Sequence, residues 1–283
     1  MTEGNLITPA QNTWCPGCGN FSLQFTLKAL LEGLKKEGRS LDDVVLVTGI
    51  GCHAKMADYL NINSFYSLHG RTIPAATGIK LANPDLEVIC CAGDGDCYAE
   101  GLDHLIFAAK RNIGITVLVH NNRVYGLTTG QYTPTSPLGF RGKSTPAGTV
   151  ELPFNPLEIM LSSGATFIAR GYTRRPDQLK MLVSDAVAHH GFSFVDVLQI
   201  CATYNNMTDY YNSHVYELGD HDTSNFNDAC EKAREWDYNT DSGIGLGIFF
   251  QKSAPTFEER ILTRHGHVPD KMDAIRRILD EKT

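Results

Sequence analysis

The 283-residue sequence has no uninterrupted apolar run of the roughly 20 residues that a membrane-spanning helix needs. Its first residues include an acid and lack an apolar segment, so no secretory signal is expected and the cytoplasm is the expected compartment. Basic residues are too few to balance the acids, which gives a net charge of −7. This deficit argues against general nucleic-acid binding, which requires a basic face.

Internal repeats, low-complexity segments and an obvious interdomain linker are absent as well. With 42% hydrophobic residues, the chain can bury the core of one large α/β domain. The eight cysteines are not typical of a disulfide framework in a cytoplasmic chain of this length. Metal binding or simple burial explains them better.

Strand-like and helix-like patterns alternate along the chain. This alternation predicts an α/β fold, with a mostly parallel sheet and helices on both faces. Such folds bind ligands at the carboxyl ends of their strands. The expected strands are residues 44–47, 86–92, 115–119, 166–169 and 194–200, and the expected helices are residues 21–36, 73–81, 100–110, 156–163, 176–189 and 272–279.

Two stretches depart from this pattern. Residues 128–156 are rich in Thr, Pro and Gly, and a loop of that length inside a domain usually has a function or contacts a partner. Beyond residue 205 the sequence is polar, apart from an apolar run at 243–250. We therefore expect an α/β domain over residues 1–205 and a C-terminal arm over residues 206–283, packed on the domain or on a partner.

Two motifs at expected strand ends suggest a diphosphate and magnesium site. Gly93-Asp94-Gly95-Asp96 follows one strand, and Asn121-Asn122 ends the next. Glycines allow backbone to approach a phosphate closely, and carboxylate and amide oxygens suit Mg²⁺. A lone Gly-Asp-Gly is more often a plain turn, but the second half of the pattern at this distance favours the cofactor site.

Four cysteines also fall in turns or at strand ends: Cys15, Cys18, Cys52 and Cys201. Thiolates from such loops can converge on an iron–sulfur cluster or on a structural zinc, and spacing alone does not separate the two. Taken singly, Cys52 and Cys201 are compatible with simple burial.

Three basic side chains stand near these motifs. Lys55 follows Cys52 and could meet a substrate carboxylate or a diphosphate, although a solvated surface lysine is an equal alternative. His69 and Arg71 precede an expected helix, where anions bind well. Their alternative is a capping or surface role.

Taken in order, the motifs resemble one family. They are Cys15-Pro-Gly-Cys-Gly19, Gly49-Ile-Gly-Cys52, His69-Gly-Arg71, Gly93-Asp-Gly-Asp96, Asn122-Arg-Val-Tyr-Gly-Leu-Thr128 and Cys201-Ala-Thr-Tyr-Asn205. This series resembles the β subunit of 2-oxoacid:ferredoxin oxidoreductases, most closely the 2-oxoglutarate branch. The resemblance implies the diphosphate-binding domain of the thiamine-diphosphate-binding fold.

The resemblance also implies roles for individual residues. It gives the Mg²⁺ ligands as Asp94, Asn122 and the Val124 carbonyl, and the [4Fe–4S] ligands as Cys15, Cys18, Cys52 and Cys201. The residues expected to contact thiamine diphosphate are Ile50, Gly51, Cys52, His69, Gly93, Asp94, Gly95, Asp96, Asn122, Tyr125, Gly126, Leu127 and Thr128. The expected catalytic residues are Lys55, His69, Arg71, Leu127, Thr128 and Thr129.

The implied activity is the oxidative decarboxylation of a 2-oxo acid to an acyl-coenzyme A, with electrons passed to ferredoxin. The glutamate that activates thiamine belongs, in this family, to a pyrimidine-binding domain. Since the sequence shows one α/β domain, an α subunit should complete the site, as a dimer of αβ heterodimers. The Tyr125–Gln131 loop favours 2-oxoglutarate. Alternatives are pyruvate or a broad 2-oxo acid range, a non-redox thiamine decarboxylase half with a zinc site, and a zinc-stabilised interaction subunit.

Overall fold

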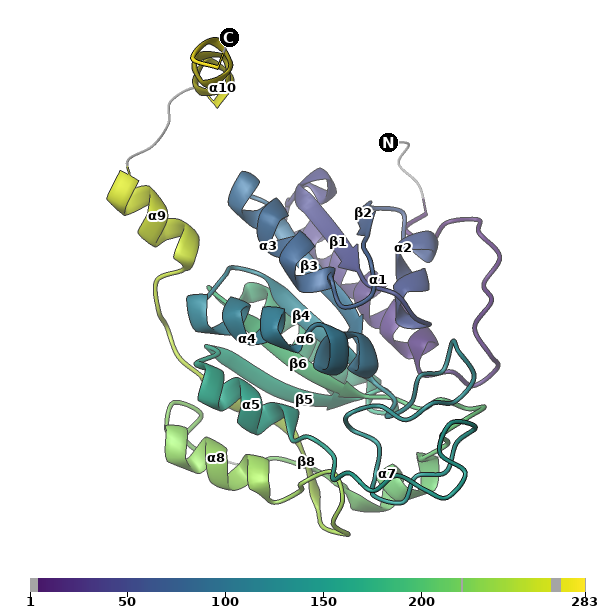
Figure 1. The fold of residues 1–283 in the computed structure, drawn as a ribbon. Helices are drawn as coiled ribbons and strands as arrows, with labels where there is room; N and C mark the ends of the chain where they lie inside the picture. Colours follow the sequence, from purple (N-terminus) through teal and green to yellow (C-terminus); the bar gives the residue numbers. More distant parts are fainter. Residues whose placement is uncertain (1–4, 220, 266–270, 283) are drawn as a thin grey trace.

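The computed structural model describes residues 5–219, 221–265 and 271–282 (Figure 1). Within these ranges the strands are β1 (Val44–Thr48), β2 (Asn63–Tyr66), β3 (Glu87–Gly93), β4 (Thr116–Asn121), β5 (Phe167–Tyr172), β6 (Ser193–Leu198), β7 (Val215–Glu217) and β8 (Ile244–Gln251). They form one sheet in the order β2-β1-β3-β4-β6-β5-β8-β7. The first six strands in that order are parallel, whereas β8 is antiparallel to β5.

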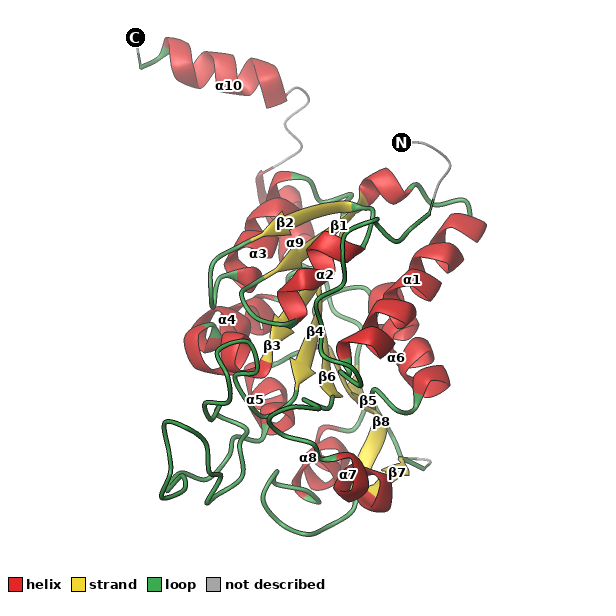
Figure 2. Ribbon diagram, turned by 90° about the vertical axis from the view of Figure 1, so that its right-hand side faces the viewer, coloured by secondary structure: helices red, strands yellow, loops and turns green. Residues whose placement is uncertain are grey.

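The helices of the described ranges are α1 (Asn20–Lys36), α2 (Met56–Tyr59), α3 (Thr72–Ala82), α4 (Leu102–Arg111), α5 (Pro156–Ser163), α6 (Pro176–Ala188), α7 (Thr208–His214), α8 (Phe226–Arg234), α9 (Phe257–His265) and α10 (Lys271–Asp280). Figure 2 shows α1 and α6 on one side of the sheet and α3, α4 and α5 on the other. The expected α/β class, with a mostly parallel sheet and helices on both faces, is confirmed.

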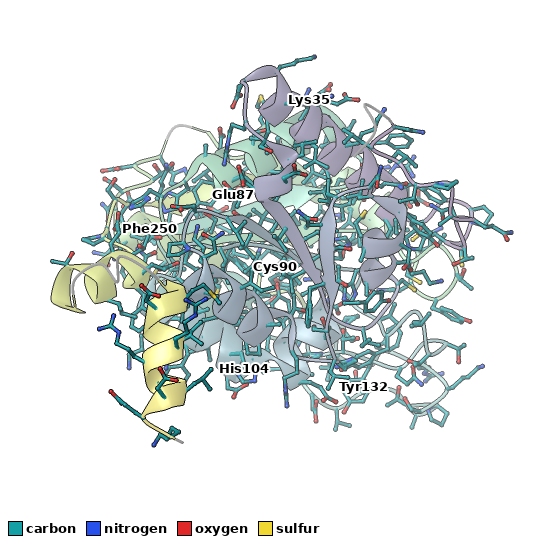
Figure 3. All side chains as sticks on the ribbon, turned by 90° about the horizontal axis from the view of Figure 1, so that it is seen from above. Lys35, Glu87, Cys90, His104, Tyr132 and Phe250 are labelled. Carbon is teal, nitrogen blue, oxygen red and sulfur yellow. The ribbon has the colours of Figure 1, made fainter. Side chains whose placement is uncertain are left out.

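Each face of the sheet has its own hydrophobic core. Leu23, Leu27 and Leu182 belong to the core beneath α1 and α6. Ile73 and Leu105 belong to the core beneath α3 and α4. Strand residues alternate between these cores, so the strands are apolar on both faces, as a covered parallel sheet requires. In Figure 3, Cys90 of β3 lies in the middle of the packed side chains, and it is fully buried.

The sheet continues beyond residue 205, where we expected an arm to begin. Strands β7 and β8 add to its edge, and Trp236, Tyr238 and Phe249 are buried in the core beneath α3, α4, α5 and α8. The polar composition of residues 206–242 hid this contribution, because few apolar residues there suffice to anchor the segment. The expected helix at 272–279 corresponds to α10, which follows a stretch outside the described residues.

Between β4 and α5, the fully described residues 122–155 form no helix or strand, as expected for the Thr/Pro/Gly-rich stretch. Strands β2 and β7 and helices α2, α7, α8 and α9 were not anticipated, and the apolar run at 243–250 corresponds to strand β8. The expected helix at 100–110 corresponds to α4, which begins at Leu102 after a π-helical turn over residues 96–100. Such turns often occur at functional sites. Among the described residues, no helix combines the length and the apolarity needed to cross a bilayer.

Trp236 allows a test of whether residues 206–251 belong to the same cooperative unit. Its ring is 1% exposed and stacks on Tyr238 with 4.2 Å between ring centroids. Trp236→Ala should lower the free energy of unfolding by about 3–5 kcal/mol, because it empties a large buried volume. Phe226→Ala, at a side chain that is 47% exposed, should cost less than about 1 kcal/mol. Urea unfolding of both variants measures the difference. Equally small losses in the two variants would contradict the conclusion that residues 206–251 belong to the same cooperative unit.

Candidate active site

Four strand ends meet at one edge of the sheet. Because β1, β3, β4 and β6 run in the same direction, the loops that follow them lie side by side. They surround a narrow cavity of about 60 Å³, here called the strand-edge cavity. The structure brings every predicted cofactor-contacting residue to its lining: Ile50, Gly51, Cys52, His69, Gly93, Asp94, Gly95, Asp96, Asn122, Tyr125, Gly126, Leu127 and Thr128.

Asp94 lies at the buried end of this cavity and is 2% exposed. Burial raises the pKa of its carboxyl to about 6, although hydrogen bonds from Thr133 and Thr135 act in the opposite direction. The Thr135 hydroxyl lies 3.0 Å from Asp94 Oδ2 and 2.9 Å from Asn121 Oδ1. Thr135 therefore connects the Gly-Asp-Gly turn with the Asn-Asn motif, a role that no sequence motif indicates.

The predicted magnesium ligands share the cavity wall. Asp94, Asn122 and Val124 all line it. The Asn122 side-chain oxygen accepts a hydrogen bond from the Val124 backbone N–H at 3.1 Å, which holds the turn between them. A carboxylate, an amide oxygen and a nearby backbone carbonyl form a donor set of the kind that Mg²⁺ accepts beside a diphosphate.

The glycines of the site are needed for close packing. A Cβ on Gly95 would lie 2.2 Å from the Tyr125 ring, and a Cβ on Gly93 would lie 2.7 Å from Nδ1 of His53. Tyr125 in turn donates a hydrogen bond from its hydroxyl to the Gly95 carbonyl at 3.1 Å. The Gly-Asp-Gly turn is thus held between an aromatic ring and an imidazole that frame the cavity.

Asp96 organises the neighbouring loops. Its carboxylate accepts hydrogen bonds from the Gly70 backbone N–H at 2.7 Å and from the Thr72 hydroxyl at 3.3 Å. His53 Nε2 lies 3.3 Å and His69 Nδ1 3.6 Å from its oxygens. Burial alone would raise the pKa of Asp96, but these partners lower it below its usual value.

Two histidines missed as site residues line the cavity with His69. His120 is fully buried, and its Nδ1 lies 2.8 Å from Asn20 Oδ1. Burial holds the pKa of His120 well below 6.5, so its ring is neutral. Among the described residues, His120 Nε2 has no hydrogen-bond partner, whereas His53 Nε2 lies 3.3 Å from the Asp96 carboxylate. A polar atom left without a partner beside a cavity fits a site that receives a polar ligand.

Three of the predicted catalytic residues do not line the cavity. Lys55 donates a hydrogen bond to the Thr13 hydroxyl at 2.8 Å. Burial raises the pKa of the Cys52 thiol, and the charge of Lys55 acts in the opposite direction. Arg71 donates to the Glu100 carbonyl at 3.1 Å. Thr129 lies just beyond Thr128 and receives a hydrogen bond from Lys143 Nζ at 3.3 Å. The loop that carries Lys143 therefore folds back beside the rim of the cavity.

The four motif cysteines gather next to the cavity. All are free thiols, and Cys18 interacts electrostatically with Cys15, Cys52 and Cys201. Burial raises the pKa of Cys18 to about 11, and the neighbouring thiols contribute in the same direction. A site that holds cysteines as thiolates therefore needs a positive centre to offset their desolvation.

Specific contacts hold the cysteine loops together. The Gly19 backbone N–H donates to the Ile200 carbonyl at 3.1 Å, which joins the Cys15–Cys18 turn to the end of β6. The Trp14 indole N–H donates to the Cys52 carbonyl at 2.7 Å. Gly17 has a φ of +81°, a conformation that favours glycine in the tight Cys-Pro-Gly-Cys turn.

Among the described residues, no three His, Cys, Asp or Glu side chains form a group that could hold a metal ion. A four-iron cluster is bound by four thiolates spread around a cube, so its ligands are further apart than those of one ion. Four mutually interacting thiols, three of them in loops tied to one sheet edge, fit such a cluster.

Two protein-family models match successive parts of this chain. The family described as "Thiamine pyrophosphate enzyme, C-terminal TPP binding domain" matches residues 49–197. The family described as the C-terminal part of the pyruvate ferredoxin oxidoreductase beta subunit matches residues 201–265. The β subunit of 2-oxoacid:ferredoxin oxidoreductase from Saccharolobus solfataricus is 41% identical over 271 residues, which cover 89% of this chain and 86% of that one.

The chain belongs to the β-subunit family of 2-oxoacid:ferredoxin oxidoreductases. The 2-oxoglutarate synthase subunit KorB of Methanothermobacter thermautotrophicus is 41% identical over 191 residues, with 68% and 66% of the two chains covered. A solved chain of the 2-oxoglutarate:ferredoxin oxidoreductase from Magnetococcus marinus superposes with a TM-score of 0.87 at 33% identity, covering 96% of this chain and 94% of that one. The family and the thiamine-diphosphate-binding fold expected from the motifs are confirmed.

Asp94 should destabilise the β subunit when no metal is bound. Its folded pKa of about 6 lies above the ordinary value of 3.8, so folding favours the protonated form. As the pH rises from about 4 to 6, Asp94 ionises in the unfolded chain before it ionises in the folded chain. The free energy of unfolding therefore falls by up to about 3 kcal/mol. Asp94→Asn, which keeps an oxygen for Thr135, should remove that loss.

Urea unfolding of the chelator-treated chain measures this effect. Asp94→Asn should be more stable than the parent chain at pH 7, and the difference should vanish below pH 4. The matched control is Asp103→Asn, at a carboxylate that is 70% exposed, and it should change stability by less than about 0.5 kcal/mol. An Asp94→Asn variant that is less stable than the parent chain at pH 7 would contradict the conclusion that the ionised Asp94 carboxylate destabilises the metal-free fold.

Proposed function

We propose that this β subunit provides the diphosphate half of a thiamine diphosphate site and the iron–sulfur cluster that receives its electrons. The net reaction converts a 2-oxo acid, coenzyme A and two oxidised ferredoxins into an acyl-coenzyme A, CO₂, a proton and two reduced ferredoxins. Thiamine diphosphate, when bound, supplies the electron sink for decarboxylation. Asp94, Asn122 and the Val124 carbonyl would hold its Mg²⁺, and Tyr125 to Thr128 would line the reacting end.

The observation that carries this proposal is the wall shared by the two sites. Gly126 lines the strand-edge cavity. A Cβ at Gly126 would lie 3.5 Å from Cys201 Sγ and 3.7 Å from Cys52 Sγ. Cys52 itself also lines the cavity. A cluster held by these thiols would therefore lie beside the cofactor, where a one-electron acceptor is needed. In the alternative, a non-redox thiamine enzyme, a structural zinc held by the same cysteines would have no need to lie beside the cofactor.

Cys201 tests the cluster assignment. In the assembled enzyme, Cys201→Ser should lose most of the acid-labile sulfide and the broad absorption near 400 nm, because the cluster loses one of its thiolates. Cys230→Ser, at a thiol outside the group, should keep both. Iron and sulfide assays on anaerobically purified protein measure the outcome. Full iron and sulfide content in Cys201→Ser would remove Cys201 from the ligand set, and zinc in place of iron would favour the non-redox alternative.

The geometry also supports a partner subunit. Pockets for small molecules usually measure about 300–1,000 Å³, whereas the strand-edge cavity of this chain measures about 60 Å³. The relatives are named as β subunits, so an α subunit is the natural source of the missing walls. We propose that it provides the pyrimidine-binding domain and its glutamate, and that the enzyme is a dimer of αβ heterodimers.

For the substrate we propose 2-oxoglutarate, which gives succinyl-coenzyme A. The solved relative from Magnetococcus marinus has 2-oxoglutarate, coenzyme A and succinyl-coenzyme A bound. The second carboxylate of 2-oxoglutarate needs a cationic or hydrogen-bonding partner once it is buried. In this chain, Thr128 and Thr129 offer hydroxyls, and Lys143 Nζ lies 3.3 Å from the Thr129 hydroxyl. Pyruvate, which lacks that carboxylate, is the alternative.

The deciding measurement is kcat/KM of the αβ enzyme for both acids, with coenzyme A and a viologen acceptor. The value for 2-oxoglutarate should exceed that for pyruvate, and Lys143→Ala should lower it about tenfold, or about 1.4 kcal/mol, without changing the value for pyruvate. The control Arg141→Ala, two residues away and also exposed, should change neither. A tenfold preference for pyruvate would overturn the substrate proposal, and equal losses for both acids in Lys143→Ala would remove the carboxylate role of Lys143.

A further inference from the structure

Residues of α1 and α6 and of the loops beside them line a wide groove. Figure 2 shows these two helices on the side of the sheet away from α3 and α4. The volume of the groove is about 570 Å³, far more than that of the strand-edge cavity. The two helices that form it pack on each other, and the Ser22 hydroxyl donates to the Thr173 carbonyl at 2.7 Å across their junction. The groove is therefore a fixed feature of the fold rather than a gap between loops.

One end of the groove reaches the cysteine group. Cys18, Gly17 and Gly19 line it, and Cys18 is one of the proposed cluster ligands. The other motif cysteines do not line this groove. A molecule seated here would therefore approach the cluster through the Cys18 turn. Electron transfer between proteins requires close approach of the two redox centres, which makes this end of the groove an exit route.

The groove combines an exposed aromatic ring with positive charge. Phe25 lines it and is 65% exposed. Arg174 and Lys180 also line it and are exposed, and neither forms an ion pair with any part of the chain that the structure describes. Asp177 is the one carboxylate in the lining.

This excess of positive charge stands out in a chain whose net charge is −7. Nearby on α1, Lys28 and Glu32 lie 3.3 Å apart and neutralise each other. With two cationic side chains and the one carboxylate of Asp177 among its described lining residues, the groove keeps a net positive charge for a partner. Opposite charges across a transient interface mainly raise the association rate.

We propose that the α1–α6 groove is the docking site for the electron acceptor, a small acidic iron–sulfur protein. This inference rests on the proposed function. Phe25 would supply the apolar contact, and Arg174 and Lys180 would attract acidic side chains of the carrier. At each encounter the oxidised carrier would accept one electron from the cluster that the four cysteines would hold, and no bond would form or break. Two encounters complete a turnover, and a small, salt-sensitive interface suits a carrier that must leave each time.

The test uses the assembled αβ enzyme and a purified acidic [4Fe–4S] ferredoxin. Arg174→Glu and Lys180→Glu should each raise the KM for ferredoxin about three- to tenfold at low ionic strength, whereas turnover with methyl viologen and iron content should not change. Binding of oxidised ferredoxin, measured by calorimetry without substrate, should weaken to the same extent and lose its salt dependence. Lys110→Glu, an exposed lysine of α4 on the opposite face of the sheet, is the matched control and should behave as the parent enzyme.

Three results would count against docking in this groove. Unchanged ferredoxin KM and binding in both groove variants would overturn it and leave the proposed function intact. Loss of α-subunit binding in these variants would show that the α subunit lies over the groove, which also overturns it. An αβ enzyme that oxidises no 2-oxo acid even with viologen would instead overturn the proposed function, and the docking inference with it.

Discussion

The parallel alignment of β1, β3, β4 and β6 is the constraint on which the candidate site depends. In a parallel sheet all carboxyl ends lie at one edge, so residues separated by more than a hundred positions become neighbours. Cys52, Asp94, Asn122 and Cys201 each follow one of these strands. An antiparallel arrangement of the same segments would place half of them at the opposite edge. The antiparallel strand β8 is accordingly confined to the far side of β5, where it carries none of these residues.

The residues proposed to bind the cofactor, the magnesium ion and the cluster were largely predictable from the sequence, because most of them belong to short motifs. Gly-Asp-Gly after an apolar strand and Cys-Pro-Gly-Cys in a turn show their geometry in a few positions. Thr135 and Lys143 were not predictable, because their roles depend on where a 34-residue segment without regular structure (122–155) folds back. His120 was missed because it lies within the buried strand β4, where it is not marked off from core residues. Trp236 and Tyr238 were missed for a different reason. They are isolated aromatic residues in polar surroundings, and burial there follows from tertiary packing rather than from periodicity.

A buried hydrogen-bond network around Asp196 orients residues next to the candidate site. The Asp196 carboxylate accepts hydrogen bonds from Tyr98 at 2.9 Å, from the Asn121 amide at 2.9 Å and from Tyr238, and Arg170 lies 3.9 Å away. Burial raises the pKa of Asp196 despite these partners. Such networks contribute little net stability, since desolvation offsets the attraction. Their effect here is orientation: Asn121 is fixed by Asp196 on one side and by Thr135 on the other, and Thr135 in turn holds Asp94.

The strand-edge cavity and the α1–α6 groove share no lining residue, so the proposed chemistry and the proposed electron exit lie apart. Cys97 and Tyr98, which follow the Gly-Asp-Gly turn, pack into the core beneath α3 and α4. Cys18 and Cys52 pack against the core beneath α1 and α6. Gly126 connects the cavity with the cysteine group, since it lines the strand-edge cavity and faces the thiols of Cys52 and Cys201. A carrier in the α1–α6 groove would therefore reach the cysteine group without covering the cavity, so substrate exchange and electron transfer need not compete for one opening.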